Sequence, residues 1–148
     1  MKHTICKIFS FDAAHHLPDY EGLCSAHHGH HWTLEIEIEG FPEPKTGMIV
    51  DFKILNSWVK ELIIDKLDHT DINNLISNPT AENILSWIYL TLSLSSKFQF
   101  KLSRLRLYET ENSFIYATGD ISFEVVKRKV KEMNEEEGEH ETYDLQDF

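Results

Sequence analysis

The length, composition and charge of the chain exclude several broad classes of protein. It has 148 residues, of which 41% are hydrophobic and 26% charged, as in one ordinary globular domain rather than a disordered or collagen-like chain. Its 14 basic residues stand against 25 acidic ones, a formal net charge of −11. Binding to a polyanion through bulk charge is therefore disfavoured, and nucleic acid is not expected as a partner.

The acidic charge is concentrated at the C-terminal end. Residues 131–148 hold eight acidic residues and one lysine, a net charge of −7, so residues 1–130 carry the remaining −4. A segment of this composition repels itself and has little apolar surface to bury. We expect one domain over residues 1–130, followed by an acidic, flexible tail over residues 131–148.

Targeting signals and cysteine usage indicate a cytoplasmic protein with no membrane partner. The most apolar stretch, residues 84–94, is about half of the roughly 20 residues that a transmembrane helix needs. The first four residues contain no apolar signal core. A reducing cytosol would keep Cys6 and Cys24 as thiols, so at least one is available for chemistry.

Two stretches near the N-terminus alternate between apolar and polar residues, which is typical of strands with one buried face. In residues 4–15 the odd positions are the more apolar, with Lys7 as the exception. In residues 28–39 the even positions provide the apolar face, and the odd positions from 33 onward are threonine and glutamate. That apolar face consists of Trp32, Leu34, Ile36 and Ile38.

Two helices are expected next. A connection rich in Gly and Pro at residues 40–47 leads to Asp51, which stands where an N-cap belongs. Apolar residues then recur at spacings of three and four as far as about Lys66, which predicts a helix with one buried stripe. After a loop at residues 67–73, the sequence Asn78-Pro79-Thr80 offers a cap and a pre-set first turn for a second helix. Its inward side chains would be Ile84, Leu85, Ile88 and Leu92.

Residues 102–110 and 114–126 alternate again and are separated by a short connection, which predicts a hairpin. The order of elements is then strand, strand, helix, helix, strand, strand. Segregated helices and hairpins are typical of an α+β domain. We expect a four-stranded antiparallel sheet with the two helices covering one face.

Histidines are concentrated near the end of the first predicted hairpin. Of nine histidines, six lie between positions 15 and 31. His28 and His30 are two apart on a strand, so both point to the apolar face, and His15 lies on the apolar parity of the first strand. Three histidines leave the fourth position of tetrahedral zinc open to water or substrate, as in catalytic sites. We expect Zn²⁺ bound by His15, His28 and His30.

The remaining three histidines of this cluster, His16, His27 and His31, have the opposite parity. We expect them to be structural or exposed. Cys24 is either a fourth ligand that closes a structural zinc site or a thiolate base beside an open one, and spacing alone does not decide.

Two further groups are candidates for acid–base chemistry or recognition. Asp68-His69 can relay a proton near neutral pH, although such a pair also occurs in capped turns. Glu109 continues the inward parity of its strand, and a buried carboxylate needs paired donors. The amino-pyrimidinone edge of a pterin or guanine offers two adjacent N–H donors that match it. A salt bridge with Arg104 or Lys101 is the alternative, and it fits less well because the parity of Arg104 is wrong.

Six short blocks of sequence, spread over about residues 4–126, occur in the same order as in a known protein family. They are Phe11-Asp12-Ala13-Ala14-His15-x-Leu17-Pro18, Cys24-x-x-x-His28-Gly29-His30, Gly47-Met48-x-x-Asp51-Phe52, Leu67-Asp68-His69-x-x-x-Asn73, Pro79-Thr80-x-Glu82-Asn83 and Glu109-Thr110. Together they resemble the 6-pyruvoyltetrahydropterin synthase family. The resemblance covers the whole predicted domain and leaves out only the acidic tail.

This resemblance implies a tunnelling fold, in which sheets from several subunits close into an oligomeric barrel with active sites between neighbouring subunits. Members of the family are commonly homohexamers built from two trimers. A closed assembly of this kind also uses up exposed sheet edges. The implied substrate is a small pterin triphosphate.

The resemblance also implies roles for single residues. By position, His15, His28 and His30 look like the zinc ligands. Cys24 looks like the general base and His69 like its proton-relay partner, oriented by Asp68. Glu109 resembles the anchor of the pterin, and Thr80 and Glu82 resemble the segment that helps to hold the pterin ring.

The spacing Cys-x-x-x-His-Gly-His is similar to that of the bacterial queuosine-pathway branch, the 6-carboxytetrahydropterin synthases. The implied reaction converts 7,8-dihydroneopterin triphosphate and water to 6-carboxy-5,6,7,8-tetrahydropterin, acetaldehyde and triphosphate. A 6-pyruvoyltetrahydropterin synthase would share every site residue, and a non-catalytic zinc- and pterin-binding protein would keep the fold. An aldolase variant carries a glutamate close before the histidine pair, where this chain has His27, so the sequence argues against that variant.

Overall fold

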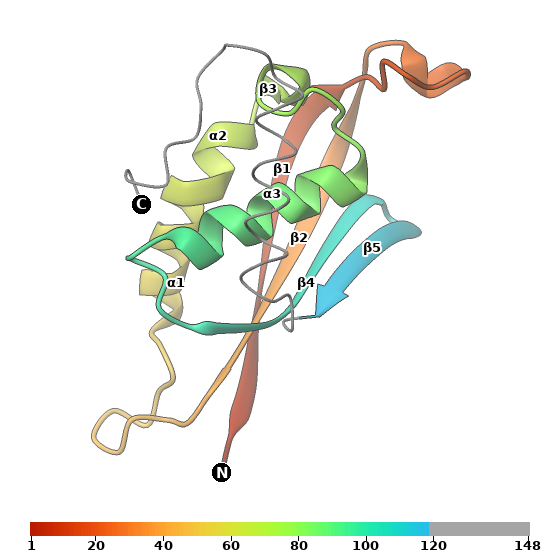
Figure 1. Ribbon diagram of the computed structural model, residues 1–148. Helices are drawn as coiled ribbons and strands as arrows, with labels where there is room; N and C mark the ends of the chain where they lie inside the picture. The colour runs from red at the N-terminus through yellow and green to blue at the C-terminus, as the bar shows by residue number, and fades with distance from the viewer. Residues whose placement is uncertain (119–148) are drawn as a thin grey trace.

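Five strands form one sheet in the order β3-β1-β2-β4-β5, with helices packed on one face (Figure 1). The computed structural model describes residues 1–118. Strands β1 (His3–His15) and β2 (His28–Gly40) pair antiparallel along their full length, so that His15 lies opposite His28. Both predicted N-terminal strands are confirmed.

The predicted C-terminal hairpin is also confirmed within the described residues. Strand β4 (Lys101–Thr110) pairs with β2, and β5 (Ser113–Thr118) pairs with β4, both antiparallel. Ile115 and Ala117 lie opposite Leu107 and Leu105, as the predicted phase requires. The rest of the predicted last strand, residues 119–126, and the acidic tail lie outside the described residues.

The prediction of four antiparallel strands is wrong in one respect, because a fifth strand is present. Strand β3 (Thr70–Asp71) pairs parallel with Ala13 and Ala14 of β1. Two residues are too few to produce a periodic pattern in the sequence. His69, with a positive φ of 57°, directly precedes β3. This short strand brings residues 70–73 alongside the end of β1.

The first predicted helix is present in three consecutive pieces. Helix α1 (Phe52–Val59) continues through a π-helical segment, η2 (Lys60–Ile64), into α2 (Asp65–Leu67). The Asp51 carboxylate accepts a hydrogen bond from the Lys53 amide at 2.7 Å, which confirms the predicted N-cap.

The second helix, α3 (Ala81–Leu94), crosses the sheet (Figure 1) and begins later than predicted. Its N-cap is Thr80, whose hydroxyl accepts from the Asn83 amide at 3.2 Å, and not Asn78. Pro79 therefore precedes the cap instead of forming the first turn. The reason is that a threonine hydroxyl placed directly before the helix can bond the free amide three residues on. No helix in the described part of the chain is long and apolar enough to span a membrane.

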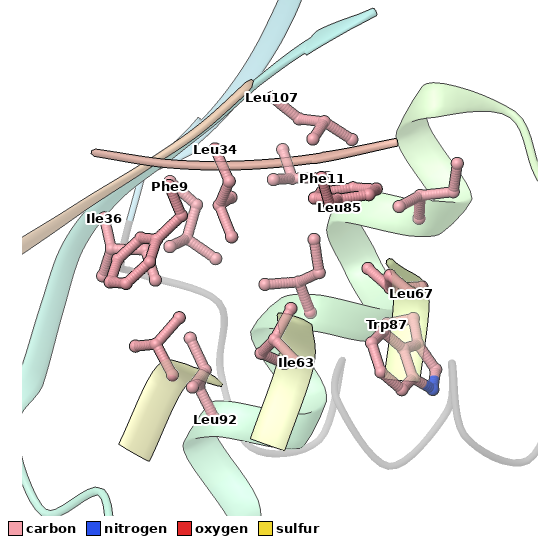
Figure 2. Packing of buried hydrophobic residues seen from close by; sticks show 14 of the residues in the cluster. Phe9, Phe11, Leu34, Ile36, Ile63, Leu67, Leu85, Trp87, Leu92 and Leu107 are labelled. Atoms are coloured by element: carbon pink, nitrogen blue, oxygen red, sulfur yellow. The ribbon is translucent and has the colours of Figure 1, made fainter. Parts of the chain in front are cut away.

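The hydrophobic core lies between the helices and the covered face of the sheet. The apolar residues predicted for β2 are all 0% exposed, and those predicted for α3 are buried. Figure 2 shows Phe9, Phe11 and Leu34 of the sheet facing Ile63 and Leu92 of the helices. Burial of one such side chain contributes about 1.5–3 kcal/mol, so this layer fixes which face of each strand points inward.

The opposite face of the sheet carries charge instead of a second core. Glutamates of β2 form cross-strand ion pairs with basic residues of β4 at 2.7–3.2 Å. The pairs are Glu35–Arg106, Glu37–Arg104 and Glu39–Lys101.

Two adjacent residues of α1 test the assignment of the covered face. Leu55 is 0% exposed and Ile54 is 45% exposed. We expect Leu55→Ala to lower the free energy of unfolding by about 2–5 kcal/mol, because it leaves a cavity in the core. Ile54→Ala should change it by only about 0.5 kcal/mol, measured by urea denaturation. Equal losses for the two variants would contradict the packing described here.

Candidate metal centre and active site

Three imidazoles meet where β1 ends and β2 begins. One ring nitrogen from each of His15, His28 and His30 lies within 4.8 Å of the other two. The Nε2 atoms of His15 and His28 are 3.0 Å apart. The register of the hairpin causes this, because His15 lies directly opposite His28 and His30 is two residues further along the same face.

Backbone carbonyls fix the orientation of two of these rings. His15 Nδ1 lies 2.8 Å from the carbonyl oxygen of Pro79, and His28 Nδ1 lies 2.8 Å from that of Ala26. A carbonyl only accepts, so both Nδ1 atoms donate their protons. In the neutral rings the lone pair is then on Nε2, which faces the cluster, and this is the arrangement of metal-binding histidines.

The surroundings of His15 and His30 favour the neutral, metal-binding form of their imidazoles. Burial lowers the pKa of His15, and the neighbouring His28 lowers it further. The pKa of His30 is also lowered, again chiefly by burial. His15 is 1% exposed and packs edge-on against Trp32 at 5.1 Å between ring centroids.

This donor set fits a transition-metal ion. Three neutral nitrogen ligands on one face suit zinc and its neighbours, and they leave room for water or a substrate oxygen as a further ligand. Among the described residues the cluster consists of His15, His28 and His30, and it includes no cysteine.

Glu109 lies beside the imidazoles. Its Oε1 is 3.4 Å from His15 Nε2 and 3.7 Å from His30 Nε2. The prediction of a buried carboxylate is only partly right, because the side chain is 34% exposed. The ladder between β4 and β5 shifts register between Tyr108 and Thr110, and such a bulge re-aims the residue that it contains. Arg104 pairs with Glu37 instead of Glu109.

Two cavities adjoin the cluster. One, of about 600 Å³, is lined by Glu109, Tyr108 and His30 among others. The other, of about 560 Å³, is lined by Asp12, His69 and His30 among others. Both also include Gly29 and His31, so Glu109 and His69 line two hollows that meet along the start of β2.

Asp68 and His69 lie at ion-pair distance without a hydrogen bond between their side chains. Asp68 Oδ2 lies 3.7 Å from His69 Nε2, which is too long for a hydrogen bond. Instead, Asp68 Oδ1 accepts from the Asp12 amide at 2.9 Å, and the His69 amide donates to the Asp12 carbonyl at 2.7 Å. The backbone of β1 thus holds both residues, and the His69 ring is left 79% exposed.

Cys24 and the two residues of the second helix stand apart from the cluster. Cys24 is half-buried in a 3₁₀ turn, η1 (Leu23–Ser25), of the segment that joins β1 to β2. Thr80 caps α3 next to Pro79, the residue that accepts from His15. Glu82 is exposed, and neither Thr80 nor Glu82 lines the two cavities described above.

The histidines of opposite parity have partners that the sequence did not reveal. His27 and His31 are exposed, as expected, but His27 Nε2 bonds Asp71 at 2.7 Å and His31 Nδ1 bonds Asp12 at 2.8 Å. Burial alone would raise the pKa of Asp71, but hydrogen bonds from His27 and from the Asn73 amide lower it. Asp71 belongs to β3, whose position no periodic signal indicates.

Comparison with known proteins identifies the family of this chain. The model of the 6-pyruvoyl tetrahydropterin synthase family matches residues 4–120. The chain belongs to this family. Its fold is also that of a Caenorhabditis elegans 6-pyruvoyl tetrahydropterin synthase, with a TM-score of 0.71 at 22% identity over 81% of this chain and 97% of that one. The predicted α+β tunnelling fold is thus confirmed.

Two curated relatives within the family have different names. A dihydroneopterin monophosphate aldolase of Pyrococcus furiosus is 39% identical over 111 residues, which is 74% of this chain and 91% of the relative. A 6-carboxy-5,6,7,8-tetrahydropterin synthase of Haemophilus influenzae is 34% identical over 135 residues, covering 74% of this chain and 94% of the relative. The family is one of pterin-processing lyases, and this member is therefore an enzyme.

The two roles open to Cys24 predict different metal contents. Because Cys24 lies outside the three-histidine cluster, Cys24→Ala should still bind one metal ion per chain, as should the matched control Cys6→Ala. His28→Ala should lose most of it, since two imidazoles hold a transition metal much more weakly than three. Elemental analysis after dialysis measures this. Loss of the ion from Cys24→Ala alone would make the thiol a ligand.

Proposed function

We propose that the protein is a zinc-dependent lyase of queuosine biosynthesis. It would convert 7,8-dihydroneopterin triphosphate and water to 6-carboxy-5,6,7,8-tetrahydropterin, acetaldehyde and triphosphate. The observation that carries the proposal is the meeting of three imidazoles, two of them oriented by backbone carbonyls, with the Glu109 carboxylate, 3.4 Å from His15, beside a cavity of about 600 Å³. Several relatives named as 6-carboxy-5,6,7,8-tetrahydropterin synthases support the choice of reaction.

Recognition of the substrate begins with Glu109. Its two oxygens match the paired N–H donors on the amino-pyrimidinone edge of a pterin, and charge-assisted pairs of this kind are strong and directional. A cavity of about 600 Å³ falls within the range of small-molecule sites. Thr80 and Glu82 would support the ring from the start of α3.

The imidazoles would hold zinc where the substrate's side chain ends. Bound zinc supplies a Lewis acid that lowers the pKa of the side-chain hydroxyls. His15, His28 and His30 hold the ion, and the carbonyls of Pro79 and Ala26 keep two of the rings turned toward it. The burial of His15 keeps bulk water from its side of the site.

Protons would then be moved by two groups of different exposure. Cys24, half-buried, would act as the base that removes a proton from the substrate side chain. His69, with its ring 79% exposed, would exchange that proton with solvent. Asp68 would contribute by fixing the backbone of this loop on Asp12 rather than by touching the imidazole.

A second candidate is the cleavage of dihydroneopterin monophosphate by an aldolase. It is favoured by the 39% identity to the Pyrococcus furiosus enzyme. The chain has Cys24 but no glutamate close before its histidine pair, and for that reason we place it second. A 6-pyruvoyltetrahydropterin synthase activity would use the same residues and eliminate triphosphate without releasing acetaldehyde.

We also propose a homohexamer of two trimers, with active sites between subunits. On its outer side β1 pairs with β3 at Ala13 and Ala14, and Asp12 bonds to Asp68 and His69, so within the described chain the edge over residues 3–11 has no strand partner. Apolar side chains such as Ile8 and Tyr116, 60% and 61% exposed, lie on the uncovered face. Both features suit closure of a barrel by neighbouring sheets.

Product analysis tests the reaction. We expect the zinc-loaded protein to convert 7,8-dihydroneopterin triphosphate to 6-carboxytetrahydropterin, with one acetaldehyde per turnover, as followed by mass spectrometry and a coupled assay. Cys24→Ala should be inactive while retaining zinc. A pyruvoyl product without acetaldehyde, or turnover of dihydroneopterin monophosphate alone, would contradict the proposal and select one of its competitors.

The proposed anchoring role of Glu109 predicts that a substitution there lowers the affinity for pterin. Glu109→Gln keeps the size of the side chain but replaces one acceptor oxygen by a donor, so it should weaken pterin binding by at least about tenfold. Equilibrium binding of a pterin, followed by fluorescence, measures this. Zinc content should be unchanged, and unaltered pterin affinity would remove Glu109 from the recognition site.

A further inference from the structure

The segment that carries Cys24 has little apolar anchoring. It comprises residues 16–27, which join β1 to β2 and project beyond the end of the hairpin (Figure 1). No residue of its 3₁₀ turn is buried, and Leu23 and Tyr20 are 94% and 53% exposed. Because the segment buries so little apolar surface, its position depends on polar contacts.

Those contacts gather at its two ends. Asn73 binds the main chain of His16 twice, accepting from its amide and donating to its carbonyl, both at 2.9 Å. His27 Nε2 bonds Asp71 Oδ2 at 2.7 Å. The His16 and His27 rings lie 4.3 Å apart. We call His27, Asp71 and Asn73 the loop clasp, since one short stretch, from the last residue of β3 to Asn73, binds both ends of the segment.

Main-chain hydrogen bonds link the residues beside the loop clasp to the turn that carries Cys24. Leu17, next to the clasped His16, donates its amide to the Cys24 carbonyl at 2.9 Å. Ala26, next to His27, accepts from His28 Nδ1 and is bonded through its amide to Leu23. A shift of either end therefore moves the turn that contains Cys24.

We propose that the loop clasp is a positioning device for Cys24, and that the His27–Asp71 bond is its specific component. The Asn73 bonds engage main-chain atoms and do not depend on which residue stands at position 16. The His27–Asp71 bond joins two side chains, so it depends on both. This proposal rests on the proposed role of Cys24 as base, but its physical content, the restraint of the segment, can be measured without turnover.

The experiment uses the full-length, zinc-loaded protein with Cys6→Ser, which leaves Cys24 as the single thiol. We expect His27→Ala to raise the rate of Cys24 alkylation by iodoacetamide about fivefold at one fixed pH, because loss of one hydrogen bond opens the segment by about that factor. Amide hydrogen exchange over residues 17–26 should quicken by a similar factor.

Two variants serve as controls. Asp71→Asn keeps only one of the two oxygens that accept from His27 and from the Asn73 amide, so its rates should lie between those of the parent protein and those of His27→Ala. Glu61→Gln removes an exposed contact with Lys97 that is remote in sequence from the segment, and should change neither rate. In a double-mutant cycle, His27→Ala should add little to Asp71→Ala if the two residues act as a pair.

Turnover gives a further readout. A failure of the loop-clasp proposal can be distinguished from a failure of the proposed function. His27→Ala should lower kcat about fivefold with KM and zinc content unchanged, because the base acts on substrate already bound. Unchanged alkylation and exchange in His27→Ala would overturn the loop clasp. Altered alkylation and exchange in a protein that turns over no pterin would support the restraint and reject the proposed function instead.

Discussion

The register of the β1–β2 hairpin is the constraint on which the rest of the structure depends. A slip of one residue would move every side chain of a strand to the opposite face of the sheet. The fully buried row that begins at Trp32 opposes such a slip, because it would place four large apolar side chains in water. The same register sets His15 opposite His28. The core therefore fixes which side chains meet in the three-histidine cluster, and the carbonyls of Pro79 and Ala26 orient two of the rings.

The sequence predicts those parts of the molecule that repeat with a regular period. Alternation identifies β1, β2 and β4, and a spacing of three and four identifies the buried stripes of both helices. The inward parity of His15, His28 and His30 follows from the same alternation, so their meeting was predictable. Asp51 was recognisable as a cap because its helix begins directly after it.

What the sequence does not predict depends on contacts between distant segments. Strand β3 has two residues and exists only because β1 offers an edge there, so Asp71 and Asn73 carry no local signal of their contacts. Asn78 and Thr80 are both good caps, and the choice between them depends on how α3 meets the sheet. The partial exposure of Glu109 results from a shift of register in the β4–β5 ladder, which alternation alone would not reveal.

Solvent exposure differs strongly among the residues of the candidate site. His15 is 1% exposed on the covered face, Glu109 is 34% exposed beside it, and the His69 ring is 79% exposed. Groups that hold a ligand by orientation gain from exclusion of water, whereas a group that exchanges protons needs contact with it. The buried end of the β1–β2 hairpin provides the first condition, and the exposed loop that carries His69 provides the second.

The left-handed backbone conformation of His69 affects which residues are favourable at this position. At a φ of 57° a residue with a Cβ atom is strained by about 1 kcal/mol, and glycine would remove that strain. A stability-driven drift of sequence would therefore favour glycine or asparagine here. Neither glycine nor asparagine has a side chain that exchanges protons, so an imidazole at this position comes with a conformational cost.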